Sequence, residues 1–145
     1  MNRIDPTPNT NGFATAIEII AKAAVGRMFI LVADEDREND GDLIILADMA
    51  DANAINFMAI HGRGLICLAL EGEIVDRLGT KMMSQTKVSR LETAFTVSIE
   101  AREGVTTGIS AKDRAVTVAA AIRSGTTKQD VCSPGPRVSS ACPRG

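Results

Sequence analysis

The chain of 145 residues has no tryptophan, no tyrosine and a single histidine, His61. With only four phenylalanines, few side chains could stack on nucleic-acid bases or on sugar rings. A formal net charge of −2 at pH 7 argues against binding to nucleic acid or to a membrane surface through bulk electrostatics. The composition therefore predicts a globular protein without a nucleic-acid or membrane partner.

Long apolar runs are also missing. No stretch approaches the roughly 20 apolar residues of a membrane-spanning helix, and the N-terminal residues lack the apolar segment of a signal peptide. The three cysteines, Cys67, Cys132 and Cys142, are an odd number without metal-site spacing, so they do not predict a disulfide framework. We expect a cytoplasmic, reduced protein with one main domain over residues 14–130. Residues 1–13 are expected to form a mobile lead-in, and residues 131–145 an aberrant, disordered tail without an apolar period.

Hydrophobic periodicity predicts helices and strands in alternation. Thr15 and Glu18 match a capping box at the start of a helix, and Ser110 with Asp113 matches a second one. The two glycines after His61 predict a left-handed helix end. The remaining elements are expected as strands over residues 28–32, 43–46, 65–70 and 94–100, and as helices starting at 51, 73 and 111. The predicted class is α+β, with a mixed sheet flanked by helices.

Two of these strands carry specific predictions about burial. The run 65–70 is apolar throughout, which predicts a strand buried on both faces, with Cys67 as a small buried hydrophobe. The alternation in 94–100 predicts that Phe95, Val97 and Ile99 lie on one face.

An acidic segment, residues 34–42, joins the first two predicted strands and holds six carboxylates and one arginine. Either a bound cation offsets their repulsion, or the segment is a solvated turn. A calcium-binding EF-hand starting at Asp36 would need glutamate at its twelfth position, where Ala47 stands. Magnesium suits the segment better, since Mg²⁺ usually takes one or two carboxylates plus water and substrate oxygens. Arg37 could pair with a phosphate or carboxylate of a ligand.

A second candidate lies where Thr106, Thr107 and Gly108 precede a helix. Backbone N–H groups at a helix N-terminus attract anions, so phosphate binding is one interpretation, and an ordinary capped helix is the other. His61, at a predicted helix end, is more typical of a structural histidine than of a catalytic one.

Several blocks of this sequence closely resemble the 3,4-dihydroxy-2-butanone 4-phosphate synthase family. They are the acidic segment 34–42, residues 61–67, residues 95–97, and residues 103–111 followed by Asp113 and Arg114. The resemblance runs in order from about residue 14 to about residue 130. It implies an α/β sandwich-like fold, a cytoplasmic homodimer and a lyase reaction of riboflavin biosynthesis. That reaction converts D-ribulose 5-phosphate to formate and L-3,4-dihydroxy-2-butanone 4-phosphate with Mg²⁺ or Mn²⁺. The same domain also occurs fused to GTP cyclohydrolase II.

The resemblance also implies site residues. Glu38 would be a metal ligand, a substrate contact and a catalytic group, and Asp40 a catalytic carboxylate. Arg37, Asp42 and Thr107 would bind the sugar phosphate. The family usually has glutamate where this chain has Asp40, which is one methylene shorter.

The sequence departs from the family after Gly135. A histidine should follow, but Pro136 stands there, and the family's later metal-ligand histidine and functional glutamate are not matched. We interpret residues from about 131 on as a truncated or frame-shifted end. An inactive fragment or a weak divalent-cation-binding module is therefore the alternative to the lyase.

Overall fold

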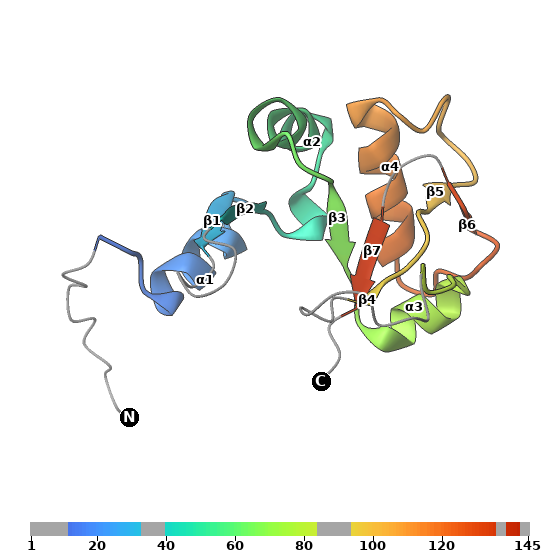
Figure 1. Ribbon diagram of the computed structural model, residues 1–145, viewed down its shortest axis with the longest axis horizontal. Helices are drawn as coiled ribbons and strands as arrows, with labels where there is room; N and C mark the ends of the chain where they lie inside the picture. The colour runs from blue at the N-terminus through green and yellow to red at the C-terminus, as the bar shows by residue number, and fades with distance from the viewer. Residues whose placement is uncertain (1–11, 33–39, 84–93, 136–138, 143–145) are drawn as a thin grey trace. The chain divides into compact units, whose positions relative to one another are not determined.

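The computed structural model describes residues 12–32, 40–83, 94–135 and 139–142 (Figure 1). The chain forms two compact units, residues 1–46 and residues 47–145. Among the described residues, no helix combines the length and the apolar character that crossing a membrane requires.

The first unit consists of helix α1 (Ala16–Ala24) and the antiparallel strands β1 (Phe29–Val32) and β2 (Gly41–Ile44). The predicted capping box is present: the Thr15 hydroxyl accepts from the Glu18 N–H, and the Glu18 carboxylate accepts from the Thr15 N–H at 2.8 Å. Both predicted strands are confirmed, but β2 begins at Gly41, earlier than predicted. Asp42 is therefore part of the strand and pairs with Leu31.

The second unit is built on a three-stranded sheet in the order β3-β7-β4. Strand β7 is parallel to β3 and antiparallel to β4, and β5 and β6 form a separate antiparallel pair. The strands are β3 (Cys67–Ala69), β4 (Ala94–Phe95), β5 (Glu100–Ala101), β6 (Val131–Cys132) and β7 (Ser139–Cys142). The helical segments are the 3₁₀ turn η1 (Ala47–Met49), α2 (Ala52–Phe57), the π-helical turn η2 (Met58–Gly62), α3 (Gly72–Leu78) and α4 (Ala111–Ile122).

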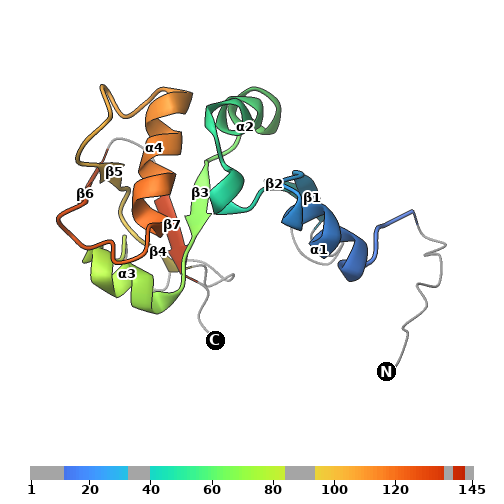
Figure 2. The same ribbon diagram turned by 180° about the vertical axis from the view of Figure 1, so that it is seen from behind.

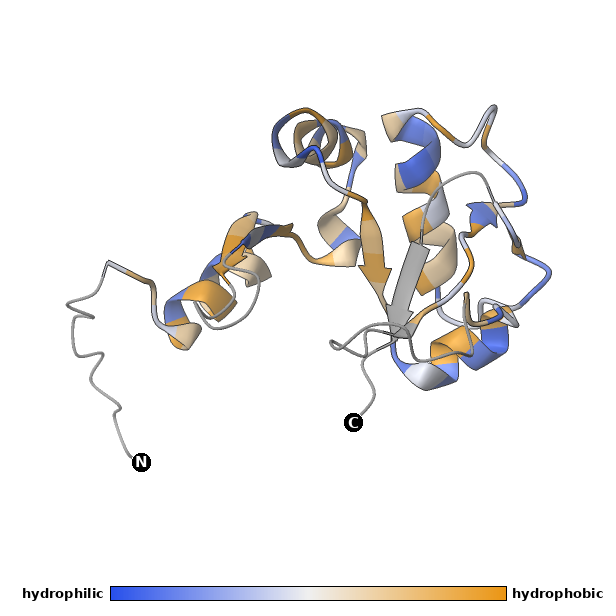
Figure 3. Cartoon of the chain, viewed as in Figure 1, coloured by the Kyte–Doolittle hydropathy of each residue, from blue (hydrophilic) through white to orange (hydrophobic). Residues whose placement is uncertain are grey.

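Helix α4 covers one face of this sheet in both views (Figures 1 and 2). Val118 and Ala121 of α4 are buried with Leu68 of β3 and Leu78 of α3 in one apolar core. Figure 3 shows hydrophobic residues along β3 and along parts of α3 and α4. Burial of these side chains supplies the main driving force that holds α4 in place.

The end of the α2 segment differs from the prediction. Asp51 caps α2 by accepting from the Ala54 N–H at 2.8 Å, as expected of a helix that starts there. The left-handed residue at the other end is Arg63, with φ 55°, and neither neighbouring glycine has a positive φ. The expected glycine cap is wrong because the helix widens into a π-turn that already takes in Gly62.

Strand β3 is buried on one face only. Ile66, Leu68 and Leu70 are buried, whereas Cys67 and Ala69 are exposed. The prediction of two buried faces, and of a buried Cys67, is wrong because the core of this unit covers only one side of the strand.

Residues 94–101 also depart from simple alternation. Thr96, Ile99 and Ala101 are buried, while Phe95 and Val97 are only half-buried. This segment pairs with β7 at Phe95 and with β6 at Glu100, so its backbone turns between the two pairings. The change of partner breaks the period of two.

Residues after 130 form strands where a loose tail was expected. Val131 is 3% exposed and belongs to the core, and residues 139–142 form the central strand β7. The expectation is wrong for these two strands, since backbone N–H and C=O groups pair whatever the side-chain pattern. Residues 136–138 and 143–145 lie outside the described residues.

Gly135 joins this end of the chain to the strand segment before β5. Its N–H donates to the Ser98 carbonyl at 2.8 Å, and the Ser98 hydroxyl donates to the Gly135 carbonyl. A Cβ at Gly135 would lie 2.5 Å from the backbone N of Glu100 and from the backbone carbon of Ile99. Only glycine fits so close to another backbone.

Gly135→Ala is therefore expected to destabilise the fold. Overpacking against backbone atoms costs about 1–3 kcal/mol, measured as a lower urea midpoint. Gly64→Ala is the matched control, because a Cβ there meets nothing closer than the Gly62 carbonyl oxygen at 3.8 Å. Equal loss in both variants would contradict the close approach at Gly135.

Candidate functional site

The acidic segment contributes two described carboxylates in the first unit. Asp40 stands immediately before β2 and Asp42 within it, and both side chains are exposed. Arg37 and Glu38, the other predicted site residues of this segment, lie outside the described residues. Exposed carboxylates beside a strand are hard oxygen ligands of the kind that Mg²⁺ prefers. Among the described residues, no group of three histidine, cysteine, aspartate or glutamate side chains could hold a metal ion. A magnesium site with few protein ligands, completed by water and substrate oxygens, is compatible with that donor set.

In the second unit, the predicted phosphate loop already holds an anion, the side chain of Asp113. One Asp113 oxygen, Oδ2, accepts from the Thr106 hydroxyl at 2.9 Å, the Thr107 N–H at 3.2 Å and the Gly108 N–H at 3.0 Å. The other, Oδ1, accepts from the Thr106 N–H at 3.2 Å. The loop N–H groups that could have bound phosphate are therefore used within the chain.

The surroundings of Asp113 hold it in the ionised form. Burial by itself would raise the pKa of this carboxyl, but the hydrogen bonds from Thr106, from Ser110 and from Gly108 outweigh that effect and lower the pKa below 3.8. Asp113 is 2% exposed, so these donors take the place of water around its charge. A buried carboxylate with this many donors is stable as an anion.

The second predicted capping box is only half formed. The Ser110 hydroxyl accepts from the Asp113 N–H at 3.0 Å and caps α4. The reciprocal bond of a capping box, from the Ser110 backbone N–H to the Asp113 side chain, is not formed, and the carboxylate accepts from the loop instead. Sequence reasoning recognised Asp113 as a cap residue and missed this role. The available signal was the Thr-Thr-Gly run, rich in N–H and hydroxyl donors, five residues before an acid.

The two threonines of the loop differ in what their hydroxyls do. The Thr106 hydroxyl donates to Asp113, whereas the Thr107 hydroxyl has no hydrogen-bond partner within the described part of the chain. Both residues are exposed. Thr107 is therefore the one that presents an available hydroxyl at the surface.

His61 and Cys67 lie elsewhere in the second unit. The His61 ring lies against the Phe57 ring, with centroids 4.3 Å apart, at the end of the α2 segment. This packing agrees with the structural interpretation of His61. Cys67 is exposed on β3, on the face opposite Leu68.

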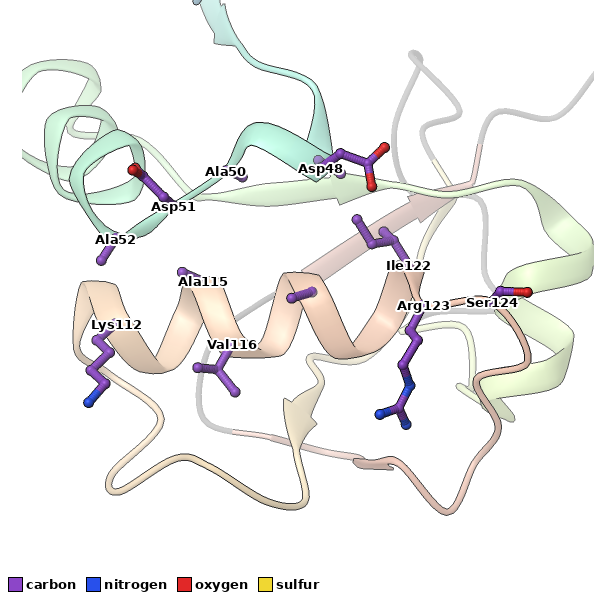
Figure 4. Close-up of a pocket in the computed structure, with 12 residues that line it drawn as sticks. Asp48, Ala50, Asp51, Ala52, Lys112, Ala115, Val116, Ile122, Arg123 and Ser124 are labelled. Carbon is purple, nitrogen blue, oxygen red and sulfur yellow. The ribbon is translucent and has the colours of Figure 1, made fainter. Parts of the chain in front are cut away.

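A shallow groove of about 590 Å³ separates α4 from η1 and the start of α2 (Figure 4). Its floor is largely alanine. Asp48 and Asp51 stand on one side, and Lys112 and Arg123 extend from α4 on the other. In most ligand sites a few polar groups converge on one point. The four charged side chains of this groove do not converge in that way. Of the described residues, neither Asp40, Asp42 nor Thr107 lines this groove.

Asp113→Asn is expected to weaken the dependence of stability on acid pH. Because folding lowers the pKa of Asp113, its ionised form stabilises the folded chain above the ordinary value of 3.8. That contribution is lost as the pH falls through the folded-state pKa. Urea unfolding over about pH 3 to 6 should show the two proteins furthest apart at the upper end, with the gap narrowing toward acid. A gap that stays constant would contradict the lowered pKa.

Comparison with known proteins assigns the chain to a family. Residues 17–139 match the family described as 3,4-dihydroxy-2-butanone 4-phosphate synthase. The chain is 46% identical to the protein of that name from Neisseria meningitidis serogroup A, over 93% of this chain and 35% of the relative. It is 53% identical to the one from Photobacterium phosphoreum, over 84% of this chain and 34% of the relative. The one from Bordetella bronchiseptica is 46% identical, over 93% of this chain and 61% of the relative.

Solved structures agree. A 3,4-dihydroxy-2-butanone 4-phosphate synthase in complex with two magnesium ions superposes with a TM-score of 0.87 at 30% identity, over 92% of this chain and 62% of that one. A two-domain synthase from A. baumannii gives a TM-score of 0.82 at 38% identity, over 88% of this chain and 37% of that one. The α+β class is confirmed by these neighbours. The chain spans between about a third and three-fifths of the length of these relatives. It belongs to the 3,4-dihydroxy-2-butanone 4-phosphate synthase family.

Proposed function

We propose that the domain to which this chain belongs converts D-ribulose 5-phosphate to L-3,4-dihydroxy-2-butanone 4-phosphate and formate, a lyase step of riboflavin biosynthesis. The observation that carries the proposal is the continuous similarity to synthases of this name, at 46–53% identity over 84–93% of the chain. The predicted site residues, in the acidic segment and in the Thr-Gly loop, lie within residues 17–139, the range that matches the family.

The proposed cofactor is Mg²⁺, with Mn²⁺ as the alternative. Glu38 is the proposed protein ligand, and one solved family structure is in complex with two magnesium ions. The oxygen-rich acidic segment has the ligand type that Mg²⁺ prefers. When bound, a divalent cation supplies Lewis acidity at the sugar oxygens.

The remaining roles fall to side chains of this chain. Arg37 carries the permanent positive charge that a sugar phosphate needs, and Asp42 can accept hydrogen bonds from sugar hydroxyls. Glu38 and Asp40 are the proposed catalytic carboxylates, since carboxylates move protons between carbon and oxygen during enediol formation. The exposure of Asp40 and Asp42 supports contact with a ligand.

The proposal also includes the cytoplasmic homodimer that the family resemblance implies. The near-neutral net charge supports the absence of nucleic-acid and membrane partners. A fusion to GTP cyclohydrolase II, which the family resemblance allows, stays a prediction.

A second candidate is a divalent-cation-binding module without turnover. Its support is Pro136, which stands where the family resemblance implies a histidine. Formate release from ribulose 5-phosphate and Mg²⁺ by the purified chain would support the lyase. Mg²⁺ binding without formate release would support the module.

Glu38→Gln is expected to weaken Mg²⁺ binding by about tenfold or more, because carboxylate ligands set the affinity of such sites. Isothermal titration with MgCl₂ measures this. Glu35→Gln is the matched control, since it removes the same charge from the same segment. If both variants lose the same affinity, the site responds to total charge and Glu38 is not a specific ligand.

Thr107→Val is expected to lower the affinity for ribulose 5-phosphate by about tenfold, the worth of one hydrogen bond, while thermal stability stays unchanged. Thr127→Val should behave in the opposite way. The Thr127 hydroxyl donates to Asp130 at 3.1 Å and accepts from the Gln129 N–H at 3.2 Å, so its loss affects the fold and not the ligand. Unchanged affinity in Thr107→Val would remove this residue from the proposed site.

A further inference from the structure

Asp113 is a buried ionised side chain that the proposed reaction does not use. It is 2% exposed, and its carboxylate accepts four hydrogen bonds from residues 106–108. Three of these donors are backbone N–H groups, which is the arrangement a loop before a helix offers to a bound anion. In this chain the anion is part of the protein.

The backbone of Asp113 is itself anchored from two directions. Its N–H donates to the Ser110 hydroxyl at 3.0 Å, and its carbonyl accepts from the Thr117 hydroxyl at 2.9 Å. The same Thr117 oxygen accepts from the Ala101 N–H of β5 at 3.1 Å. Thr117 is 1% exposed, so these bonds lie inside the core. The carboxylate is therefore a fixed point to which the loop is attached.

The bonds to Asp113 determine which threonine hydroxyl of the loop, that of Thr106 or that of Thr107, is available to a ligand. Because Asp113 takes the Thr106 hydroxyl and the Thr107 N–H, the loop is held with the Thr107 hydroxyl as its available donor. Helix capping does not explain this use of the side chain, since the Ser110 hydroxyl performs the capping.

We propose that Asp113 is a positioning residue for ligand binding: its carboxylate replaces an external anion in the loop 106–108 and thereby orients the Thr107 hydroxyl toward the sugar phosphate. The part that concerns the sugar phosphate rests on the proposed function. The part that concerns the loop rests on the hydrogen bonds alone.

Hydrogen exchange on the full chain tests the loop. In Asp113→Asn, either orientation of the amide turns an –NH₂ group toward at least one loop donor. Exchange at the amides of Thr106, Thr107 and Gly108 should rise by about tenfold or more relative to the Val118 amide in the core of α4. Asp130→Asn is the control, because it removes a carboxylate that accepts from Thr127 and not from residues 106–108, and it should leave this ratio unchanged. Equal exchange in wild type and Asp113→Asn would overturn the proposal.

A double-mutant cycle tests whether Asp113 affects ligand binding through Thr107. The affinity for ribulose 5-phosphate is measured by isothermal titration. Asp113→Asn should lower the affinity by about fivefold or more in the wild-type background, and by less than about twofold in the Thr107→Val background. Equal losses in both backgrounds would overturn the proposal, since a general structural defect acts whether or not Thr107 is present.

The two failures can be told apart. If the wild-type chain does not bind ribulose 5-phosphate, the proposed function fails. The exchange ratio then still decides whether Asp113 holds the loop, because that measurement needs no ligand.

Discussion

Four hydrogen bonds converge on the buried carboxylate of Asp113, and the conformation of the loop before α4 depends on them. A charge with so little solvent exposure is stable only when fixed donors replace water, and the donors are those of residues 106–108. The loop and the acid therefore stabilise each other: the loop satisfies the charge, and the charge satisfies the loop N–H groups. Thr117 extends this arrangement into the core through its bonds to the Asp113 carbonyl and to the Ala101 N–H.

The chain beyond residue 130 is the second constraint on this unit. Val131 enters the core that α4 covers, and β7 lies between β3 and β4 in the sheet. Gly135 lies against the backbone at Ile99 and Glu100, where no side chain fits. The chain near Gly135 thus lies beside β5, although the two are distant in sequence. Ala101 of β5 is in turn connected to Asp113 through the hydrogen bonds of Thr117. Val131, near the C-terminus, and helix α4, which follows the Asp113 loop, therefore share one core.

Much of the local structure was predictable, because its causes lie within a few residues. Thr15 with Glu18, and Asp51 with the Ala54 N–H, are caps that span three positions, and α4 follows from its period and its Ser110 cap. Other predictions failed where distant partners decide. Cys67 is exposed because the core covers one side of β3, and the segment after Phe95 changes partner, which no pattern of nearby residues encodes.

The sequence by itself determined the class of the fold, the family, and the blocks in which the predicted residues Arg37, Glu38, Asp40, Asp42 and Thr107 stand. Local propensity and short-range capping suffice to predict the fold class. The order of distinctive residues along the chain suffices to predict the family and the blocks that hold the site residues. Only the tertiary structure decided that Asp113 fills the predicted anion site, that Thr106 is occupied and Thr107 available, and that β7 is the central strand. Each of these depends on where a side chain points or on which backbone lies beside it. Such facts arise when packing and hydrogen bonding are satisfied together, and they are not a property of any one stretch of sequence.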